Sequence, residues 1–203
     1  MNHRSTAAAS LPPPGIIGLK PEWSRLVHTP GIDAAGRTWH VLDNWTGRST
    51  NPALTLLCVH GNPSWSFLWR KLLAKVQSTH GQQVRVVAVD QLDMGYSERT
   101  GLKRPLARRI DDLCQLTDTM GIRGPVVTVA HDWGGPISLG WALRHLPVSD
   151  AEAIAPESPA QLAGVILTNT AVHQPEESAA PAVIRLTRSA PVLNNATSNT
   201  RAF

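Results

Sequence analysis

One acidic residue stands where a carboxylate could act as a nucleophile. Asp132 follows an apolar run of β-forming residues, 126–130, and precedes Gly134 and Gly135, after which a helical pattern begins. This strand–turn–helix context is that of a nucleophile elbow, in which a sharp turn displays the reactive side chain at the N-terminus of a helix. The glycines allow such a turn to form without Cβ clashes, so we expect Asp132 to point out of the sheet.

A carboxylate at this position implies displacement chemistry. It attacks an electrophilic carbon directly and forms an ester through its own oxygen, so the first step needs no base. Release of the ester then needs an activated water. The alternative interpretation is that Asp132 only caps the following helix, which is a common role for aspartate. The two glycines and the preceding buried strand favour the nucleophile.

Two further side chains offer hydrogen bonds near this turn. Asn62 follows His60 and Gly61 at the end of another apolar run. Its amide can donate to a departing anion, as can the indole N–H of Trp133, and the backbone N–H groups of both residues suit an oxyanion. The competing interpretations are an Asx turn for Asn62 and core filling for Trp133. We expect His60 and His131 to be structural, because neighbouring side chains in extended chain point in opposite directions.

The elements that must position these residues alternate between buried strands and helices. Uninterrupted apolar runs predict buried strands at 53–59, 84–89, 125–130 and 162–168, and helical spacing predicts helices beginning near 68 and spanning 105–120 and 136–146. Segments 23–27 and 37–42 predict an initial antiparallel hairpin. This alternation indicates an α/β fold with a mostly parallel sheet and flanking helices. Asn62, Asp90 and Asp132 each follow a strand, at the edge where α/β proteins collect reactive groups.

Composition limits the remaining possibilities. A length of 203 residues, 42% hydrophobic and 17% charged, is ordinary for a soluble globular domain. No apolar stretch approaches the ~18 residues of a membrane span, and residues 1–15 lack a signal-peptide block, which predicts a cytoplasmic protein. Cys58 and Cys114 lie in apolar patterns typical of reduced core residues, so they do not indicate a metal site or a disulfide. We expect no metal and no cofactor. The basic run 103–109 indicates a solvated helix face and no nucleic-acid partner.

Two motifs carry a resemblance to a known family. Residues 60–70 and 131–135 closely resemble the haloalkane dehalogenase family of α/β-hydrolases, and the similarity extends over most of residues 20–190. The family implies an α/β-hydrolase fold, with Asp132 as nucleophile and Asn62 and Trp133 as halide or leaving-group ligands. It also implies a small hydrophobic substrate, namely a haloalkane, a β-lactone or an epoxide.

A branch of that family is the most similar. Segments 90–92, 94–99 and 169–174 look most like the β-lactone decarboxylases of bacterial long-chain olefin synthesis, which are often fused to an AMP-forming ligase-like partner domain. Two local departures from the family pattern stand out. Asp93 occupies a position that is usually glycine in the family, and residues 147–160 form a longer connection than the family needs.

The family pattern also places its catalytic histidine after the last strand and its acid after the sixth or seventh strand. The sixth strand here ends at Asn169, and His145 and His173 have no positional match to that base. We therefore expect a fold truncated before the cap and the last strands, inactive as this fragment. The expected segments are a disordered tail at 1–20, the N-terminal part of an α/β-hydrolase core at 21–175, and the start of a truncated cap region at 176–203.

Two other functions remain open. An epoxide hydrolase would share the pair of Asp132 and Trp133, but such enzymes typically use two cap tyrosines to polarise the epoxide oxygen. Tyr96 is the only tyrosine of this chain, which counts little because the cap is absent, and Asn62 favours dehalogenase-like chemistry more directly. A non-catalytic binding module with a degenerate hydrolase fold is the second alternative. The missing base supports that module, whereas the intact elbow and its two donors argue against it.

Overall fold

A six-stranded sheet organises the described part of the chain. The computed structural model describes residues 6–46, 48–146 and 159–171. The strands are β1 (Ser24–Thr29), β2 (Arg37–Asp43), β3 (Leu54–Val59), β4 (Val84–Val89), β5 (Pro125–His131) and β6 (Gln161–Thr168), in the spatial order β1-β2-β4-β3-β5-β6. Pairing is parallel from β4 to β6, whereas β1 and β2 form the predicted antiparallel hairpin, which joins β4 in antiparallel fashion. The mostly parallel α/β fold is confirmed.

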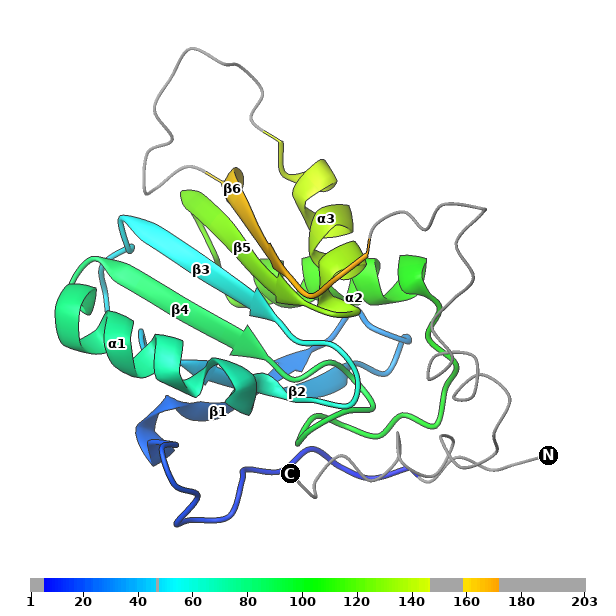
Figure 1. Cartoon of the computed structure of the whole chain (residues 1–203). Helices are drawn as coiled ribbons and strands as arrows, with labels where there is room; N and C mark the ends of the chain where they lie inside the picture. The colour runs from blue at the N-terminus through cyan, green and yellow to red at the C-terminus, as the bar shows by residue number, and fades with distance from the viewer. Residues whose placement is uncertain (1–5, 47, 147–158, 172–203) are drawn as a thin grey trace.

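Within the described ranges, three α-helices cover the two faces of this sheet. They are α1 (Arg70–His80), α2 (Leu106–Thr119) and α3 (Gly134–Arg144), with short 3-10 helices η1 (Pro21–Trp23) and η2 (Ser66–Trp69) before β1 and α1. Figure 1 shows α1 on one face of the sheet and α2 and α3 together on the other. The sequence pattern predicted each α-helix to within a few residues.

Alternation along the strands explains why both faces are apolar. In β3, Leu57 and Val59 pack toward α2 and α3, where they meet residues such as Leu113 and Ile137. The intervening Cys58 packs toward α1. Because the two faces of a central strand are both covered by helices, the sequence reads as one continuous apolar run.

The parallel registers bring three strand ends to one edge of the sheet. Val59, the last residue of β3, pairs with Val89 in β4 and with Ala130 in β5. The segments that follow these strands therefore start side by side, and they carry Asn62, Asp90 and Asp132. This is the carboxyl edge, where open α/β sheets bind ligands.

The sixth strand differs from its prediction. It was expected to be buried, but Val165, Ile166 and Leu167 are 38%, 50% and 39% exposed. Among the described strands, β6 pairs only with β5 and forms the end of the sheet, and α3 is the described helix that packs on it. An apolar run identifies a strand but does not identify which neighbours cover it.

The basic run before and within α2 is also different from the expected solvated face. Arg104 is only 7% exposed and forms ion pairs with Asp33 and Asp112. Arg108 pairs with the same two carboxylates. The acidic partner Asp33 is remote in sequence, so the pattern of the run itself gave no sign that these charges are used internally.

Residues 6–20, the described part of the tail that was expected at 1–20, make specific contacts. Ala7 forms an isolated antiparallel bridge with Arg99, and the Ser10 N–H donates to the Tyr96 carbonyl at 3.0 Å. Backbone pairing of this kind does not depend on side-chain pattern, which explains why composition did not predict it. No helix within the described ranges is long and apolar enough to cross a membrane.

Candidate active site

The strained backbone conformation in the turn between β5 and α3 is at Asp132. Asp132 has a φ of 53°, in the left-handed region that non-glycine residues rarely occupy. The two glycines after it are the first residues of α3. A Cβ on Gly134 would lie 2.1 Å from the carbonyl oxygen of Val59, so glycine is needed there for close approach between α3 and β3. The predicted elbow is present, but the glycines serve packing and not the turn dihedral.

The Asp132 carboxylate points across the edge of the sheet toward the segment after β3. Its Oδ1 accepts a hydrogen bond from the backbone N–H of Asn62 at 2.8 Å. No side chain caps α3, so Asp132 does not take the helix-capping role that was the alternative. Its Oδ2 accepts no hydrogen bond from the residues that the structure describes. The two carboxylate oxygens are therefore distinct, one held and one available.

The main chain of Asp132 is held from β6. The Thr170 hydroxyl donates to the Asp132 carbonyl at 2.7 Å, and the Asp132 N–H donates to the Thr168 carbonyl at 3.4 Å. Opposite the carboxylate, a Cβ on Gly61 would lie 2.2 Å from Oδ1. The backbone of Gly61 and Asn62 thus approaches the Oδ1 side of the carboxylate, while Thr168 and Thr170 hold the main chain of Asp132.

Of the other two predicted site residues, Asn62 contacts this carboxylate and Trp133 is its neighbour in sequence. The side-chain Oδ1 of Asn62 is buried and has no hydrogen-bond partner among the described residues, so it does not close an Asx turn. Trp133 follows Asp132 directly and is 55% exposed, which contradicts a core-filling role. The peptide bond between Asn62 and Pro63 is cis. The geometry thus brings Asn62 against Asp132 by its backbone and leaves the indole of Trp133 accessible.

His60 is a buried structural residue. Its Nδ1 lies 2.7 Å from the Gly61 carbonyl, and its Nε2 lies 3.0 Å from the backbone N–H of Gln91. A carbonyl only accepts and a backbone N–H only donates, so these partners assign the proton to Nδ1. Burial holds the pKa of His60 below its usual range of about 6.5, which keeps the ring neutral.

Asp90 anchors the two loops that border the site. Its carboxylate is fully buried and accepts from the backbone N–H groups of Ser66 and Tyr96, each at 2.7 Å, and from His40 at 2.9 Å. Burial alone would raise the pKa of Asp90, but His40 and these N–H groups outweigh it and hold the pKa below its usual range. The sequence did not indicate His40, since its partner lies 50 residues away.

Asp93, which departs from the family pattern, adopts a backbone conformation that glycine favours. Asp93 has a φ of 70°, the left-handed conformation for which glycine is the usual choice. Its carboxylate accepts from the backbone N–H and the hydroxyl of Thr100, at 2.6 and 2.9 Å. Aspartate tolerates this region better than most residues because its side chain can form such local hydrogen bonds.

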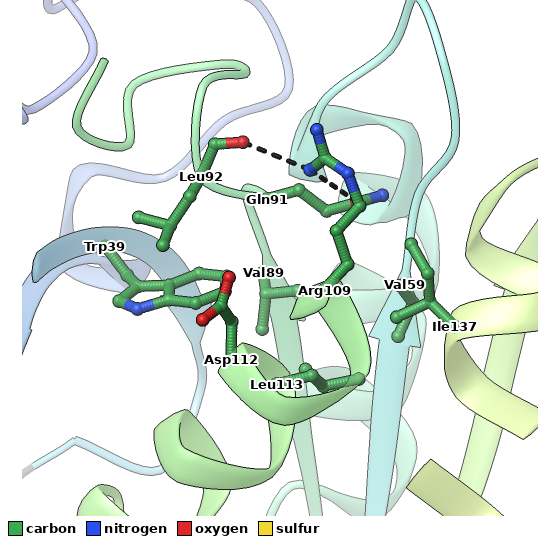
Figure 2. A pocket seen from close by; sticks show the side chains of 9 residues that line it. All are labelled: Trp39, Val59, Val89, Gln91, Leu92, Arg109, Asp112, Leu113 and Ile137. Carbon is green, nitrogen blue, oxygen red and sulfur yellow. Dashed lines mark hydrogen bonds between the residues drawn. The ribbon is translucent and has the colours of Figure 1, made fainter. Parts of the chain in front are cut away.

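A small cavity of about 10 Å³ lies behind the carboxyl edge, between α2 and the ends of β3 and β4. Figure 2 shows the side chains that line it, which are Trp39, Val59, Val89, Gln91, Leu92, Arg109, Asp112, Leu113 and Ile137. None of the three predicted site residues is among them. The cavity is too small for an organic substrate, and the residues that line it lie beneath the site.

The remaining histidines do not supply a base to Asp132 within the described residues. His145 stacks on Trp141, with ring centroids 3.8 Å apart, at the far end of α3. The Nδ1 of His131 is buried and has no hydrogen-bond partner in the described part of the chain. His173 lies outside the described residues, as do residues 147–158 of the long connection at 147–160 and the expected cap region at 176–203. No group of three or more potential metal ligands occurs in the described segments.

Known proteins are similar in sequence to this chain. Residues 55–188 match the family model described as alpha/beta hydrolase fold. Over 142 residues the chain is 33% identical to a cis-3-alkyl-4-alkyloxetan-2-one decarboxylase of Xanthomonas campestris, covering 66% of this chain and 42% of the relative. Over 182 residues it is 30% identical to haloalkane dehalogenase 2 of Mycobacterium tuberculosis, covering 89% of this chain and 52% of the relative.

A solved structure supports the same fold. The tetrameric haloalkane dehalogenase DpaA of Paraglaciecola agarilytica superposes with a TM-score of 0.62 at 19% identity, over 91% of this chain and 55% of that one. The chain spans about half the length of the relatives it matches, or less. With its mostly parallel sheet, its strand–turn–helix elbow and a matching family model, the chain belongs to the α/β-hydrolase fold family and is related to oxetanone decarboxylases and haloalkane dehalogenases.

Proposed function

We propose that this protein is a hydrolase-family enzyme in which Asp132 attacks a carbon–halogen bond or a β-lactone and forms a covalent ester. One observation carries the proposal. The Asp132 carboxylate has Oδ1 bonded to the Asn62 N–H, while Oδ2 has no hydrogen bond to a described residue. Hydrogen bonding to one oxygen leaves the other as the nucleophile.

For a haloalkane, the step is a displacement at carbon. Oδ2 of Asp132 forms the new C–O bond as the C–X bond breaks, and the halide leaves with the bonding pair. The side-chain amide of Asn62 and the indole N–H of Trp133 are the donors assigned to that anion. Oδ1 becomes the ester carbonyl oxygen, which already lies 2.8 Å from the Asn62 N–H, so the same donor serves the oxyanion when water attacks.

For a β-lactone, the same carboxylate opens the ring at the alkyl carbon. The ring C–O bond breaks and leaves a carboxylate on the neighbouring carbon, in the place that a halide would occupy. Loss of carbon dioxide then forms the alkene and expels Asp132 as a free carboxylate, so no water is consumed. The identity to oxetanone decarboxylases supports this substrate class, and it is the one that we favour.

Two observations weigh against the alternatives. Asn62 weighs against an epoxide hydrolase, because its side-chain amide can donate to a departing anion, whereas opening of an epoxide releases no separate anion. A non-catalytic module would have no need of a strained left-handed aspartate, which costs about 1–3 kcal/mol. The elbow is therefore better explained by covalent chemistry. We extend the proposal to an associated AMP-forming ligase-like domain only by resemblance to the olefin-forming branch.

The test compares two substrates on the same chain. Protein is incubated with a 1-bromoalkane or with a cis-disubstituted β-lactone of equal chain length, and bromide, alkene and intact mass are followed together. We expect an alkyl adduct that persists with the bromoalkane, because no described histidine is placed to activate water. We expect alkene release with the lactone even from this chain, because that route consumes no water and so does not need the base whose absence predicts inactivity. Asp132→Asn should abolish both. Absence of adduct, bromide and alkene from folded wild-type protein would contradict the proposal.

A further inference from the structure

The orientation of one peptide group decides whether the Asn62 N–H reaches Asp132. That N–H shares its peptide plane with the carbonyl of Gly61, and in a trans peptide the two point in opposite directions. Gly61 has to lack a side chain because Asp132 Oδ1 occupies the space of its Cβ. Glycine leaves φ and ψ poorly restricted, so the peptide groups on both sides of it need to be held by hydrogen bonds.

The peptide group after Gly61 is held by His60. The imidazole Nδ1–H donates to the Gly61 carbonyl at 2.7 Å, which turns the Asn62 N–H the other way, toward Asp132. Ser64 adds longer hydrogen bonds to the same oxygen, 3.2 Å from its hydroxyl and 3.3 Å from its N–H. This arrangement works only while Nδ1 carries the proton.

The peptide group before Gly61 is held by Gln91, which contacts His60 at two points. The backbone N–H of Gln91 donates to the imidazole Nε2 at 3.0 Å and so keeps the proton on Nδ1. The side-chain amide of Gln91 donates to the His60 carbonyl. Gln91 is 4% exposed, and it comes from the loop after β4, 31 residues from His60 in sequence.

Arg109 in α2 fixes which way the Gln91 amide faces. Figure 2 shows the guanidinium bonded to both Gln91 and the Leu92 carbonyl, with Nη1 at 3.2 Å from each oxygen. A guanidinium only donates and a carbonyl only accepts, so the amide oxygen has to face Arg109 and the amide nitrogen has to face His60.

We propose that Gln91 is a positioning residue that aligns the Asn62 N–H with Asp132 through its two-point hold on His60. This inference rests on the proposed function for its catalytic consequence, but the alignment itself is a structural claim that can be measured separately. The side chain touches neither the substrate nor the carboxylate, so its effect is transmitted through the backbone of residues 60–62. This position requires a neutral amide, because the side chain has to accept a hydrogen bond from Arg109 and also donate one to the His60 carbonyl.

The test uses the 203-residue chain with Gln91→Met, which removes both polar atoms, and Gln91→Glu, which still accepts from Arg109 but cannot donate to the His60 carbonyl. Gln115→Met, on the half-buried glutamine of α2, is the matched control. Two readouts are recorded. The first is the chemical shift and hydrogen-exchange rate of the Asn62 amide proton by NMR, and the second is the rate constant of adduct formation with a 1-bromoalkane at saturation.

We expect both Gln91 variants to move the Asn62 amide resonance, to speed its exchange about tenfold, and to slow adduct formation about tenfold with unchanged half-saturation, which is the scale of one lost hydrogen bond. Gln115→Met should change neither. If Gln91→Met does not fold, Gln91→Glu carries the test. An unchanged Asn62 resonance and exchange rate in a folded Gln91 variant overturns the inference. If the wild type forms no adduct, the proposed function fails while the NMR result still decides the role of Gln91.

Discussion

At the scale of single residues, the difference between the two oxygens of Asp132 is the feature with most consequence. The sequence pattern was enough to select this residue, because a buried strand, an acidic residue and two glycines are a local signal. It could not predict that Asp132 itself adopts a φ of 53° or that Oδ1 is held by Asn62, 70 residues away. Both properties come from contacts between loops that the chain brings together only on folding.

Replacing Asn62 with alanine separates its side chain from its backbone. Asn62→Ala keeps the backbone N–H on Asp132 but removes the amide assigned to the departing anion. A hydrogen bond to a charged group is worth about 1.5–3 kcal/mol, so adduct formation with a 1-bromoalkane should slow by roughly 10- to 150-fold. Stopped incubations analysed by intact mass give the rate. Asn51→Ala, at an exposed loop position, is the control. A rate within twofold of wild type would remove Asn62 from leaving-group binding.

At the scale of elements, the site depends on how closely α3 approaches β3. Strand and helix positions followed from apolar periodicity, because each side of the sheet has its own layer of helices. The close approach did not follow from periodicity. It is visible only as the 2.1 Å separation between a hypothetical Cβ at Gly134 and the Val59 carbonyl. Such contacts involve backbone atoms, which cannot rotate away as a side chain can.

Gly134→Ala tests this approach. Overpacking typically costs about 1–3 kcal/mol, and a clash with backbone should reach the upper end, so we expect a loss of about 3 kcal/mol in the free energy of unfolding. Gly164→Ala in β6 is the matched control, because its Cβ would meet Val127 at an ordinary 3.5 Å. Urea denaturation of both variants gives the comparison. Equal stabilities of the two variants would show that α3 shifts freely and that the approach is not needed.

The loops after β3 and β4 predict how stability depends on pH. Asp90 and His60 both have a folded-state pKa below the usual value, so each makes the folded state bind fewer protons than the unfolded state. Stability is therefore complete above the unfolded pKa and is lost as pH falls. We expect the free energy of unfolding to decline first below about 6.5, the ordinary value for histidine, and again below 3.8, the ordinary value for aspartate.

The variant Asp90→Asn tests the decline in stability that is expected below pH 3.8. It should be less stable at pH 7, because it loses the charge that His40, Ser66 and Tyr96 surround, and its stability should fall less steeply between pH 4 and pH 2. Asp33 and Asp43 also have lowered pKa values, so the loss of stability at acid pH should become smaller in this variant but should not disappear. Chemical denaturation at a series of pH values provides the measurement. If the stability of the variant falls as steeply with pH as that of the wild type, Asp90 does not contribute to the acid dependence of stability.

At the scale of the whole molecule, the parallel sheet explains why distant segments form one site. The ends of β3, β4 and β5 share an edge, so the loops that carry Asn62, Gln91 and Asp132 meet there. The fold class could be predicted because alternation of strands and helices is a pattern of the whole chain. The exposure of β6 and the burial of Arg104 could not be predicted, because both depend on which other segments pack against them in the folded chain.

One measurement tests covalent catalysis by Asp132 most directly. Trypsin releases residues 124–144 as one peptide, in which Asp132 is the only acidic residue. After incubation of the folded chain with a 1-bromoalkane, peptide mass mapping should find the alkyl group on this peptide and fragmentation should place it on Asp132. The same peptide from Asp132→Ala should be unmodified. An alkyl group on any other peptide, or one that persists in Asp132→Ala, would contradict the account.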